Sequence, residues 1–350
     1  MIAYKFRSGR GTKDSEGKDV FVRDIELLTR DTIYLPTVEQ LNDPAEALVD
    51  DSVSRLELQI LEPLVPKESY NKVKECLDDL LGRIHNAGIY SLSKRIDNEL
   101  MWAYYASGHS GYAIIIDTDV LANSFGHGKW GGMHEIDVHY SAKLPRFEID
   151  KIGKQKFEET LSCLVGTKSK AWEHEAELRL VFDKGGRCLK IDYRAVKGFV
   201  FGYRMAAEDI DYVMKAFAGR DLEYYKMTLK DGSYRLLRQR LKDEYPVTEK
   251  YCPNNVEYDV EELLEGDKVI GGVGYEYRSF VEQALKEVSR EPFVTGISHI
   301  IVDDEQRHPH ILIWTSIQQD GSIRPMRSFE YDLIEGALCR TVGNQGESRR

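Results

Sequence analysis

The sequence lacks any continuous run of about 18 apolar residues, and its five cysteines lie far apart with no C-x-x-C pair. The first absence excludes a membrane span, so we expect no membrane association. The cysteine spacing argues against a disulfide framework and fits reduced thiols. Residues 1–13 also lack the apolar segment of a secretory signal, and we therefore expect a cytoplasmic protein.

Familiar motifs of nucleotide-binding and hydrolytic enzymes are missing as well. The sequence has no G-x-x-x-x-G-K-S/T, no G-x-G-x-x-G between a strand and a helix, no G-x-S-x-G and no H-E-x-x-H. Beside His299, His308 and His310, only residues 303–305 offer clustered carboxylates, and we interpret these histidines as ordinary surface and core residues. We therefore expect no bound metal.

The composition is that of a globular protein. The 350 residues are 42% hydrophobic and 31% charged, which excludes wholesale disorder, and the length suits two domains. The net charge of −11 disfavours extensive non-specific contact with nucleic acid but does not exclude a local basic site. Residues 206–350 contribute −8 (19 Lys and Arg against 27 Asp and Glu), and residues 1–205 contribute −3 (29 against 32).

The residue patterns predict an α+β protein. Short aromatic and β-branched runs predict strands at 3–6, 32–35, 88–92, 112–117, 136–140, 177–182 and 198–201. Apolar residues at helical spacing predict helices over 67–85, from an N-cap at Asp97 to Gly108, and over 157–164. Without regular βαβ alternation, we expect a mixed sheet with flanking helices over residues 1–205. For residues 206–350 we predict a smaller acidic α+β unit.

The densest group of chemically active side chains lies between residues 168 and 182. Glu173, Glu175 and Glu177 are spaced two apart, so in an extended segment they project from one face with Arg179 beside them. Such a cluster suits stabilising a cationic transition state or accepting a proton. The alternative interpretation is a solvated edge strand. We expect Arg179 to pair with Glu175 or Glu177.

Polar side chains on two other predicted strands form further candidates. Ser91 and Ser93 share one face at the end of a strand, where their hydroxyls either hold a ligand or cap a turn. Lys5 and Arg7 share a face of the first strand and suit contact with phosphate.

One loop segment and two tryptophans are predicted to have structural roles. Residues 42–44, Asn-Asp-Pro, predict a loop that enters a helix at Pro44, with Glu46 in the first helical turn. We expect Trp102 to belong to the core and Trp172 to pack beneath the glutamate strand.

Three motifs in order resemble a prokaryotic family known as domain of unknown function 2971. They are N-D-P-x-E at residues 42–46, L-M-W-x-x-Y at 100–105 and W-x-x-E-x-E-x-R at 172–179. The resemblance covers residues 1–205, and the C-terminal unit lies outside it.

A second pattern is similar to the Arg, Ser-x-Ser and Glu-x-Glu elements of ADP-ribosyltransferases, and it implies that fold for residues 1–205, with NAD as the substrate. By this resemblance Arg7 contacts the pyrophosphate of NAD, and Ser91 and Ser93 order the pocket at the nicotinamide side. Glu177 holds the 2′-hydroxyl of the nicotinamide ribose and stabilises an oxocarbenium-like state. Glu175 orients or deprotonates the acceptor.

The same resemblance implies further site residues. Tyr90, Tyr104 or Tyr105 stacks on nicotinamide. Tyr4 and Lys5 lie beside Arg7 at the cofactor. Arg179 and Trp172 are expected to support the site, together with Asp43 and Asn42 of the N-D-P segment, which is not part of the transferase signature.

The function that follows is an NAD-consuming ADP-ribosyltransferase, a bacterial toxin or antiphage effector that modifies a nucleic acid or a protein. A toxin of this kind has a neutralising antitoxin as a possible partner. A nucleic-acid acceptor could be gripped by local basic residues, namely Lys5, Arg7, Arg10, Lys13, Lys94 and Arg95. Two alternatives stay open. One is a metal-dependent nuclease that uses Asp43, Glu46, Glu175 and Glu177. The other is a non-catalytic sensor or interaction module whose acidic C-terminal part binds a partner.

Overall fold

The computed structural model describes residues 1–125, 133–146, 157–245, 250–270, 272–305, 308–319 and 322–339. The chain divides into two compact units, Met1–Glu249 and Lys250–Arg350. The sequence-based boundary after residue 205 therefore falls inside the first unit. The reason is that β11 (Glu223–Leu229) and β12 (Leu236–Leu241) extend the sheet of that unit beyond β10 (Val196–Phe201).

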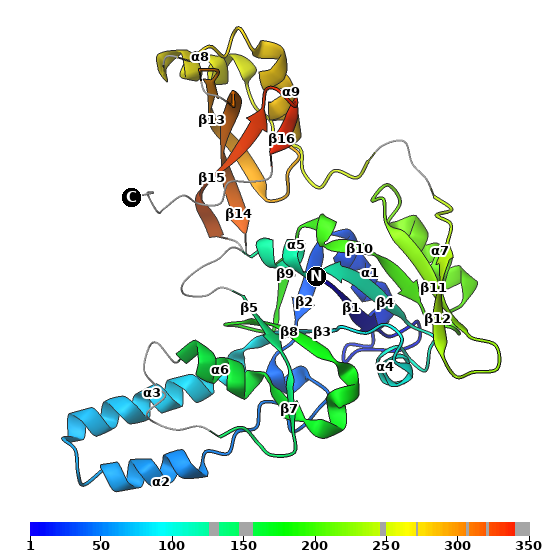
Figure 1. Ribbon diagram of the computed structural model, residues 1–350, viewed down its shortest axis with the longest axis vertical. Coiled ribbons are helices and arrows are strands. Elements are labelled where there is room, and N and C mark those ends of the chain that lie inside the picture. The colour runs from blue at the N-terminus through cyan, green and yellow to red at the C-terminus, as the bar shows by residue number, and fades with distance from the viewer. Residues whose placement is uncertain are drawn as a thin grey trace. The chain divides into compact units, whose positions relative to one another are not determined.

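An eight-stranded mixed sheet forms the framework of the first unit (Figure 1). Its strand order is β12-β11-β10-β4-β1-β3-β8-β5. The strands not yet given are β1 (Ile2–Arg7), β3 (Gly88–Ser93), β4 (Tyr112–Asp117), β5 (His134–Asp137) and β8 (Glu177–Phe182). These strands confirm the α+β class and most of the predicted strands. The strand predicted at 136–140 is divided between β5 in this sheet and a second strand, His139–Ser141, outside it.

Helices and two small sheets flank this framework. The helices are α1 (Val20–Thr29), α2 (Ser52–Leu61), α3 (Lys67–Asn86), α4 (Glu99–Tyr105), α5 (Thr118–Asn123), α6 (Phe157–Val165) and α7 (Ala207–Ala216). The two-stranded sheets are β2 (Thr32–Leu35) with β9 (Arg187–Lys190), and β6 (His139–Ser141) with β7 (Thr167–Ser169). Short 3-10 turns are η1 (Val38–Gln40), η3 (Lys170–Glu175) and η4 (Tyr193–Ala195).

Helix α4 begins one residue later than predicted. The Asn98 side chain, not that of Asp97, accepts hydrogen bonds from the backbone amides of Leu100 and Met101. These bonds satisfy donors that the first helical turn leaves unpaired. Trp102 is fully buried and packs edge-on against Phe6 of β1, as expected of a core residue. Helix α4 is thereby fixed on one face of the sheet.

The sheet nearly separates into two parts between β1 and β3. These strands pair at a single position, Tyr4 with Ser93. On either side the ladders are continuous, since β1 pairs with β4 over six positions and β3 with β8 over six positions. Where the pairing of β1 with β3 stops, their backbone groups and side chains face a gap instead of a neighbouring strand. This divergence of β1 from β3 is where the candidate site lies.

The second unit is a smaller α+β unit with its own core, as predicted. Its antiparallel sheet has the order β13-β14-β15-β16, with bounds Val294–Asp303, His310–Gln319, Ser322–Asp332 and Ala337–Cys339. Helices α8 (Val260–Ile270) and α9 (Arg278–Val288) contribute apolar side chains to this core, including Leu264 and Leu285. Among the helices described in either unit, none has the length and apolar character that a bilayer crossing requires.

Candidate functional site

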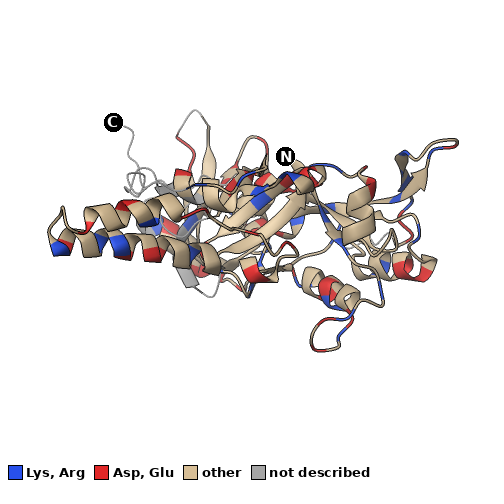
Figure 2. Cartoon of the chain, turned by 90° about the horizontal axis from the view of Figure 1, so that it is seen from below, with Lys and Arg blue, Asp and Glu red and all other residues tan. Residues whose placement is uncertain are grey.

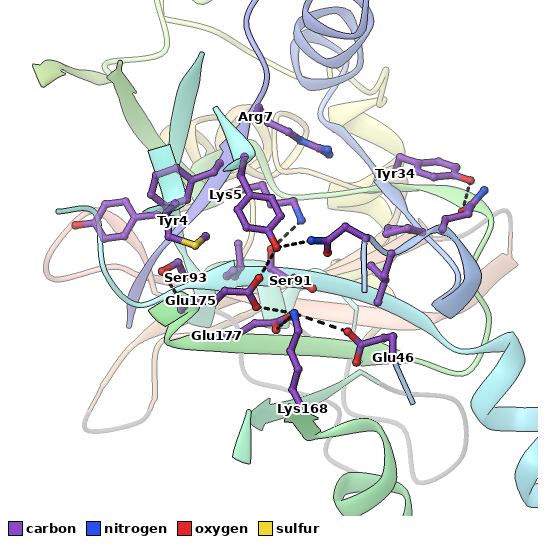
Figure 3. A pocket seen from close by; sticks show the side chains of 18 of the residues that line it. Tyr4, Lys5, Arg7, Tyr34, Glu46, Ser91, Ser93, Lys168, Glu175 and Glu177 are labelled. Atoms are coloured by element: carbon purple, nitrogen blue, oxygen red, sulfur yellow. Dashed lines mark hydrogen bonds and ion pairs between the residues drawn. The ribbon is translucent and has the colours of Figure 1, made fainter. Parts of the chain in front are cut away.

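A cavity of about 610 Å³ opens where β1 and β3 diverge. Its volume falls within the range of about 300–1,000 Å³ that is typical of small-molecule sites. Figure 3 shows Lys5 and Arg7 on one side of this cavity and Glu46, Glu175 and Glu177 around Lys168 on the other. The other lining residues are Tyr4, Phe6, Asp14, Ser15, Arg23, Tyr34, Pro36, Gln40, Leu41, Asn42, Ser91, Leu92, Ser93, Met101 and Tyr105.

One wall of the cavity is cationic. The Lys5 ammonium donates a hydrogen bond of 2.8 Å to the Ser91 carbonyl oxygen, and it lies 4.6 Å from the centroid of the Tyr90 ring. Lys5 thus bridges the two diverging strands. Burial lowers the pKa of Lys5 to about 7, and the nearby charge of Arg7 acts in the same direction.

Arg7 lies on the same wall and is anchored from α1. Its Nε is 3.3 Å from Asp24 Oδ2, and its side chain is 26% exposed. Burial lowers the pKa of Arg7, but the Asp24 carboxylate outweighs burial and leaves the pKa raised. Arg7 therefore presents a permanent positive charge at the cavity.

The opposite wall is built on Glu177 and Arg179. Both lie on β8 and are almost fully buried. The guanidinium of Arg179 donates to both oxygens of Glu177, at 3.0 and 3.1 Å. Burial raises the pKa of Glu177, but the charges of Arg179 and Lys168 outweigh it and lower that pKa to about 2. Glu177 is therefore ionised at neutral pH.

Lys168 connects three carboxylates of this wall. Its Nζ lies 2.5 Å from Glu175, 3.2 Å from Glu177 and 3.7 Å from Glu46. Burial lowers the pKa of Lys168, but these carboxylates raise it by a larger amount. Because the carboxylates converge on an ammonium group, a cation already occupies the position that a metal ion would take in a carboxylate site. Among the described residues, no group of three or more His, Cys, Asp or Glu side chains is placed to hold a metal ion.

Glu46 belongs to the same charged cluster, but not as predicted. No helix begins at Pro44, because residues 44–47 form turns. The buried Glu46 carboxylate instead pairs with Arg179 at 2.7 Å, which holds the loop against β8. Arg179 thus pairs with Glu177, as predicted, and also with Glu46, which the sequence did not predict. Asp43 is buried and accepts a hydrogen bond from the backbone amide of Ala45, and it does not line the cavity.

Glu175 joins the cluster to α4. The Tyr105 hydroxyl donates a hydrogen bond to Glu175, and the Asn42 amide donates to the Tyr105 oxygen at 2.6 Å. Burial raises the pKa of Glu175, against the opposing charge of Lys168. Burial and the bond to Glu175 also raise the pKa of Tyr105. Asn42 and Tyr105 are thus both at the site.

The two serines act in different ways. The Ser91 hydroxyl hydrogen-bonds the Glu177 carboxylate and helps to lower the pKa of Glu177. Ser93 donates to the backbone carbonyl of Glu175 at 2.6 Å, which is the turn-capping role. Both residues line the cavity. The pairs Tyr4–Ser93 and Ser93–Glu177 also place these three residues in one row across β1, β3 and β8.

The glutamate run is not extended throughout. Residues Lys170–Glu175 form η3, and Ala176 follows with a left-handed φ of 44° before β8 begins. Glu173 is consequently exposed, while Glu175 and Glu177 both reach the cavity. The prediction that all three glutamates share a face is therefore wrong, because it assumed a continuous strand.

The aromatic residues predicted at the site lie in different places. Tyr105 and Tyr4 line the cavity, whereas Tyr104 is 64% exposed, does not line it and contacts His174. Tyr90 lies beneath the Lys5 ammonium. Trp172 lies on η3 rather than beneath a strand, and its ring centroid is 5.2 Å from Lys168 Nζ.

Lys168 is the most important site residue that sequence reasoning missed. It lies within the densest charged run, but it is seven and nine residues before Glu175 and Glu177, a spacing that has no meaning until η3 turns the chain back. Tyr34, Gln40 and Met101 also line the cavity without a sequence signal.

Comparison with known proteins relates part of this site to a family. Residues 101–180 match the family model described as "Protein of unknown function (DUF2971)". The match begins within α4 and ends within β8, and so includes Tyr105, Lys168, Glu175, Glu177 and Arg179. No curated protein and no solved structure matches the chain.

Proposed function

We propose that the cavity binds NAD and that the protein is an ADP-ribosyltransferase. The observation that supports this most strongly is that Lys5 and Arg7 face a wall in which three carboxylates outnumber two cations, Lys168 and Arg179. Lys5 and Arg7 face the cavity from one side, and Glu175 and Glu177 face it from the other. NAD has a matching distribution, with an anionic pyrophosphate and a cationic nicotinamide that is joined to a hydroxylated ribose. The strand order β1-β3-β8 also aligns the basic, serine and glutamate elements of the resemblance.

The chemistry follows from the ionisation of the two glutamates. As the bond between ribose C1′ and nicotinamide breaks, its electron pair leaves with neutral nicotinamide and positive charge develops on the ribose. The ionised Glu177 stabilises that charge in the transition state. An acceptor oxygen or nitrogen then bonds to C1′, and its proton passes to the Glu175 carboxylate. A raised pKa suits Glu175 for this proton transfer.

Lys168 and Arg179 hold the glutamates in place. Arg179 contacts both oxygens of Glu177, and Lys168 fixes Glu175 at 2.5 Å. Fixed charges of this kind need little reorganisation when the transition state forms. Toxicity, an antiphage role and a neutralising antitoxin stay predictions from the resemblance. They require that expression of the wild type, and not of Glu177→Gln, arrests bacterial growth.

Release of nicotinamide from NAD by the purified protein tests the proposal directly. We expect Glu177→Gln to reduce the rate by at least about 100-fold, because removing one transition-state charge partner typically costs 10²–10³ in rate. Glu173→Gln is the matched control, since Glu173 belongs to the same run but is exposed. Both variants are checked for folding by circular dichroism and thermal unfolding. Wild-type protein that releases no nicotinamide, with protein and nucleic-acid acceptors present, would overturn the proposal.

A further inference from the structure

The β11–β12 hairpin carries an excess of positive charge in an otherwise acidic protein. Residues 223–242 contain six Lys and Arg against two acidic residues, Glu223 and Asp231, whereas the whole chain has a net charge of −11. The basic residues are Lys226, Lys230, Arg235, Arg238, Arg240 and Lys242. Strand β12 is the edge of the eight-stranded sheet, and its residues 237–240 are exposed. Figure 2 shows Lys and Arg along this hairpin, whereas the long helix α3 carries both signs of charge.

These charges are largely unneutralised. Arg240 lies 3.7 Å from Glu223. Within the part of the chain that the structure describes, no carboxylate lies within 4.0 Å of Arg235 or Arg238. A local group of unpaired cations attracts polyanions even when the net charge of the whole protein is negative. The hairpin is therefore an electrostatic site for a polyanion.

Two tyrosines give the hairpin flat surfaces next to the cations. Tyr234 in the turn is 88% exposed. The guanidinium of Arg238 lies 4.1 Å from the centroid of the Tyr225 ring. Aromatic rings and guanidinium planes stack on nucleobases, and every base offers a flat face for this contact. An acidic peptide would use the charges but not the exposed Tyr234 ring.

Arg240 of the hairpin and the proposed catalytic Glu177 lie on the same face of the sheet. Arg240 pairs with Tyr225, and the row continues through β10 and β4 to Phe6 of β1. Tyr4, two residues before Phe6, begins the row that leads through Ser93 to Glu177. Because side chains two residues apart on a strand share a face, both rows face the same way.

Helix α4 occupies this same face between the hairpin and the cavity. Met227 of β11 and Leu236 of β12 belong to the core cluster that contains Met101 and Trp102 of α4. At the start of α4, Arg95 and more weakly Arg235 lower the pKa of Asp97, so the hairpin turn lies near that residue. Tyr105 at the other end of α4 lines the cavity. A strand of nucleic acid on the hairpin would thus follow the helix that forms part of the cavity wall.

We propose that this face of the hairpin binds single-stranded nucleic acid and presents it to the cavity as the acceptor of ADP-ribose. The proposal deepens the proposed function and rests on it for the transfer step. Its binding step rests on charge, the exposed ring of Tyr234 and the shared sheet face. Basic residues on an edge strand can also serve only to prevent pairing with other chains. That role needs the arginines but no tyrosine.

Fluorescence anisotropy of labelled 20-nucleotide RNA and DNA single strands, without NAD and with the full-length protein, tests the binding step. The double variant Arg238→Glu/Arg240→Glu should weaken binding at least about tenfold and reduce the slope of log K against log salt by about two. Lys72→Glu/Lys74→Glu is the matched control, because it makes the same charge change at exposed positions of α3. Tyr234→Ala should weaken binding about fivefold or more at constant charge. The RNA and DNA arms decide which strand is preferred.

Several outcomes would overturn the proposal. One is the absence of saturable binding to either single strand. Others are equal affinities of the hairpin and α3 double variants, or an unchanged affinity of Tyr234→Ala. The proposed function fails separately, when NAD releases no nicotinamide although oligonucleotide binding persists. With labelled NAD, transfer of label to protein alone, in a mixture that also contains the oligonucleotide, would overturn the acceptor assignment but not the enzyme class.

Discussion

Each unit of the molecule contains a buried acidic centre, and the two centres differ in what they face. In the second unit Asp267 is fully buried, and its carboxylate accepts hydrogen bonds from the backbone amides of Gly274 and Val302, at 2.8 and 3.0 Å. In the first unit Glu175 and Glu177 are also buried, but their partners are side-chain cations and they line a cavity of about 610 Å³.

This difference distinguishes Asp267, whose carboxylate has a structural role, from Glu175 and Glu177, whose carboxylates a ligand in the cavity can contact. Backbone amides that bond Asp267 fix the loop at residues 272–274 to α8 and β13. A Cβ atom at Gly272 would lie 2.2 Å from the Asp267 oxygens, so the loop approaches this side chain closely. The charges of Glu175 and Glu177 are instead balanced by the side-chain cations Lys168 and Arg179, and both glutamates line the cavity. A ligand can therefore contact these carboxylates without displacing backbone hydrogen bonds.

Removing Lys168 should give the largest effect on stability. Lys168→Met leaves Glu175 and Glu177 without their shared cation, and breaking a buried ion pair from one side costs about 3–5 kcal/mol in the free energy of unfolding. Lys170→Met is the matched control, since Lys170 is exposed on the same segment. Urea unfolding measures the free energy of unfolding of both variants. Similar decreases for the two would contradict the prediction that Lys168 stabilises the fold by balancing the buried carboxylates.

Asp267→Ala should have an effect of similar size, confined to the second unit. It leaves the amides of Gly274 and Val302 without acceptors, at about 1–3 kcal/mol each. Hydrogen-exchange mass spectrometry should show faster exchange in peptides from residues 260–339. Nicotinamide release and exchange in peptides from β8 should stay unchanged. A loss of activity in this variant would contradict the division between a structural and a chemical acid.

The fold could be predicted largely where strands are buried. The strand at residues 112–117, Tyr-Ala-Ile-Ile-Ile-Asp, is buried over five of its six residues and is evident from its apolar content. Strand β12 was not predicted, because an exposed edge strand with Arg238 and Arg240 has no apolar alternation. The domain boundary was misplaced for the same reason. Local patterns do not show which strands pair across a sheet.

The candidate site could be predicted in its residue types but not in its connections. The glutamates, the serines and the first-strand cations were found from spacing and resemblance, and they line one cavity. The roles of Lys168 and Glu46 depend on contacts between distant segments, since Glu46 meets Arg179 across 133 residues. The conformation of Ala176, which separates Glu173 from Glu177, also has no signal in an alanine.

The smallest predicted effect is on the affinity for NAD, and it depends on the protonation of Lys5 in the cationic wall. Lys5 has a pKa of about 7, so above this pH the free protein loses the positive charge that a pyrophosphate requires. Binding must then include uptake of a proton, and the Kd for NAD should rise about fivefold between pH 7 and pH 8. Calorimetric titration of the wild type with a non-cleavable analogue of NAD measures this dependence, because Glu177 itself raises the pKa of Lys5 and must be kept. Lys5→Arg should flatten it, because a guanidinium keeps its charge throughout this range. A Kd that is independent of pH in the parent protein would remove Lys5 from the NAD site and leave it a strand-bridging residue.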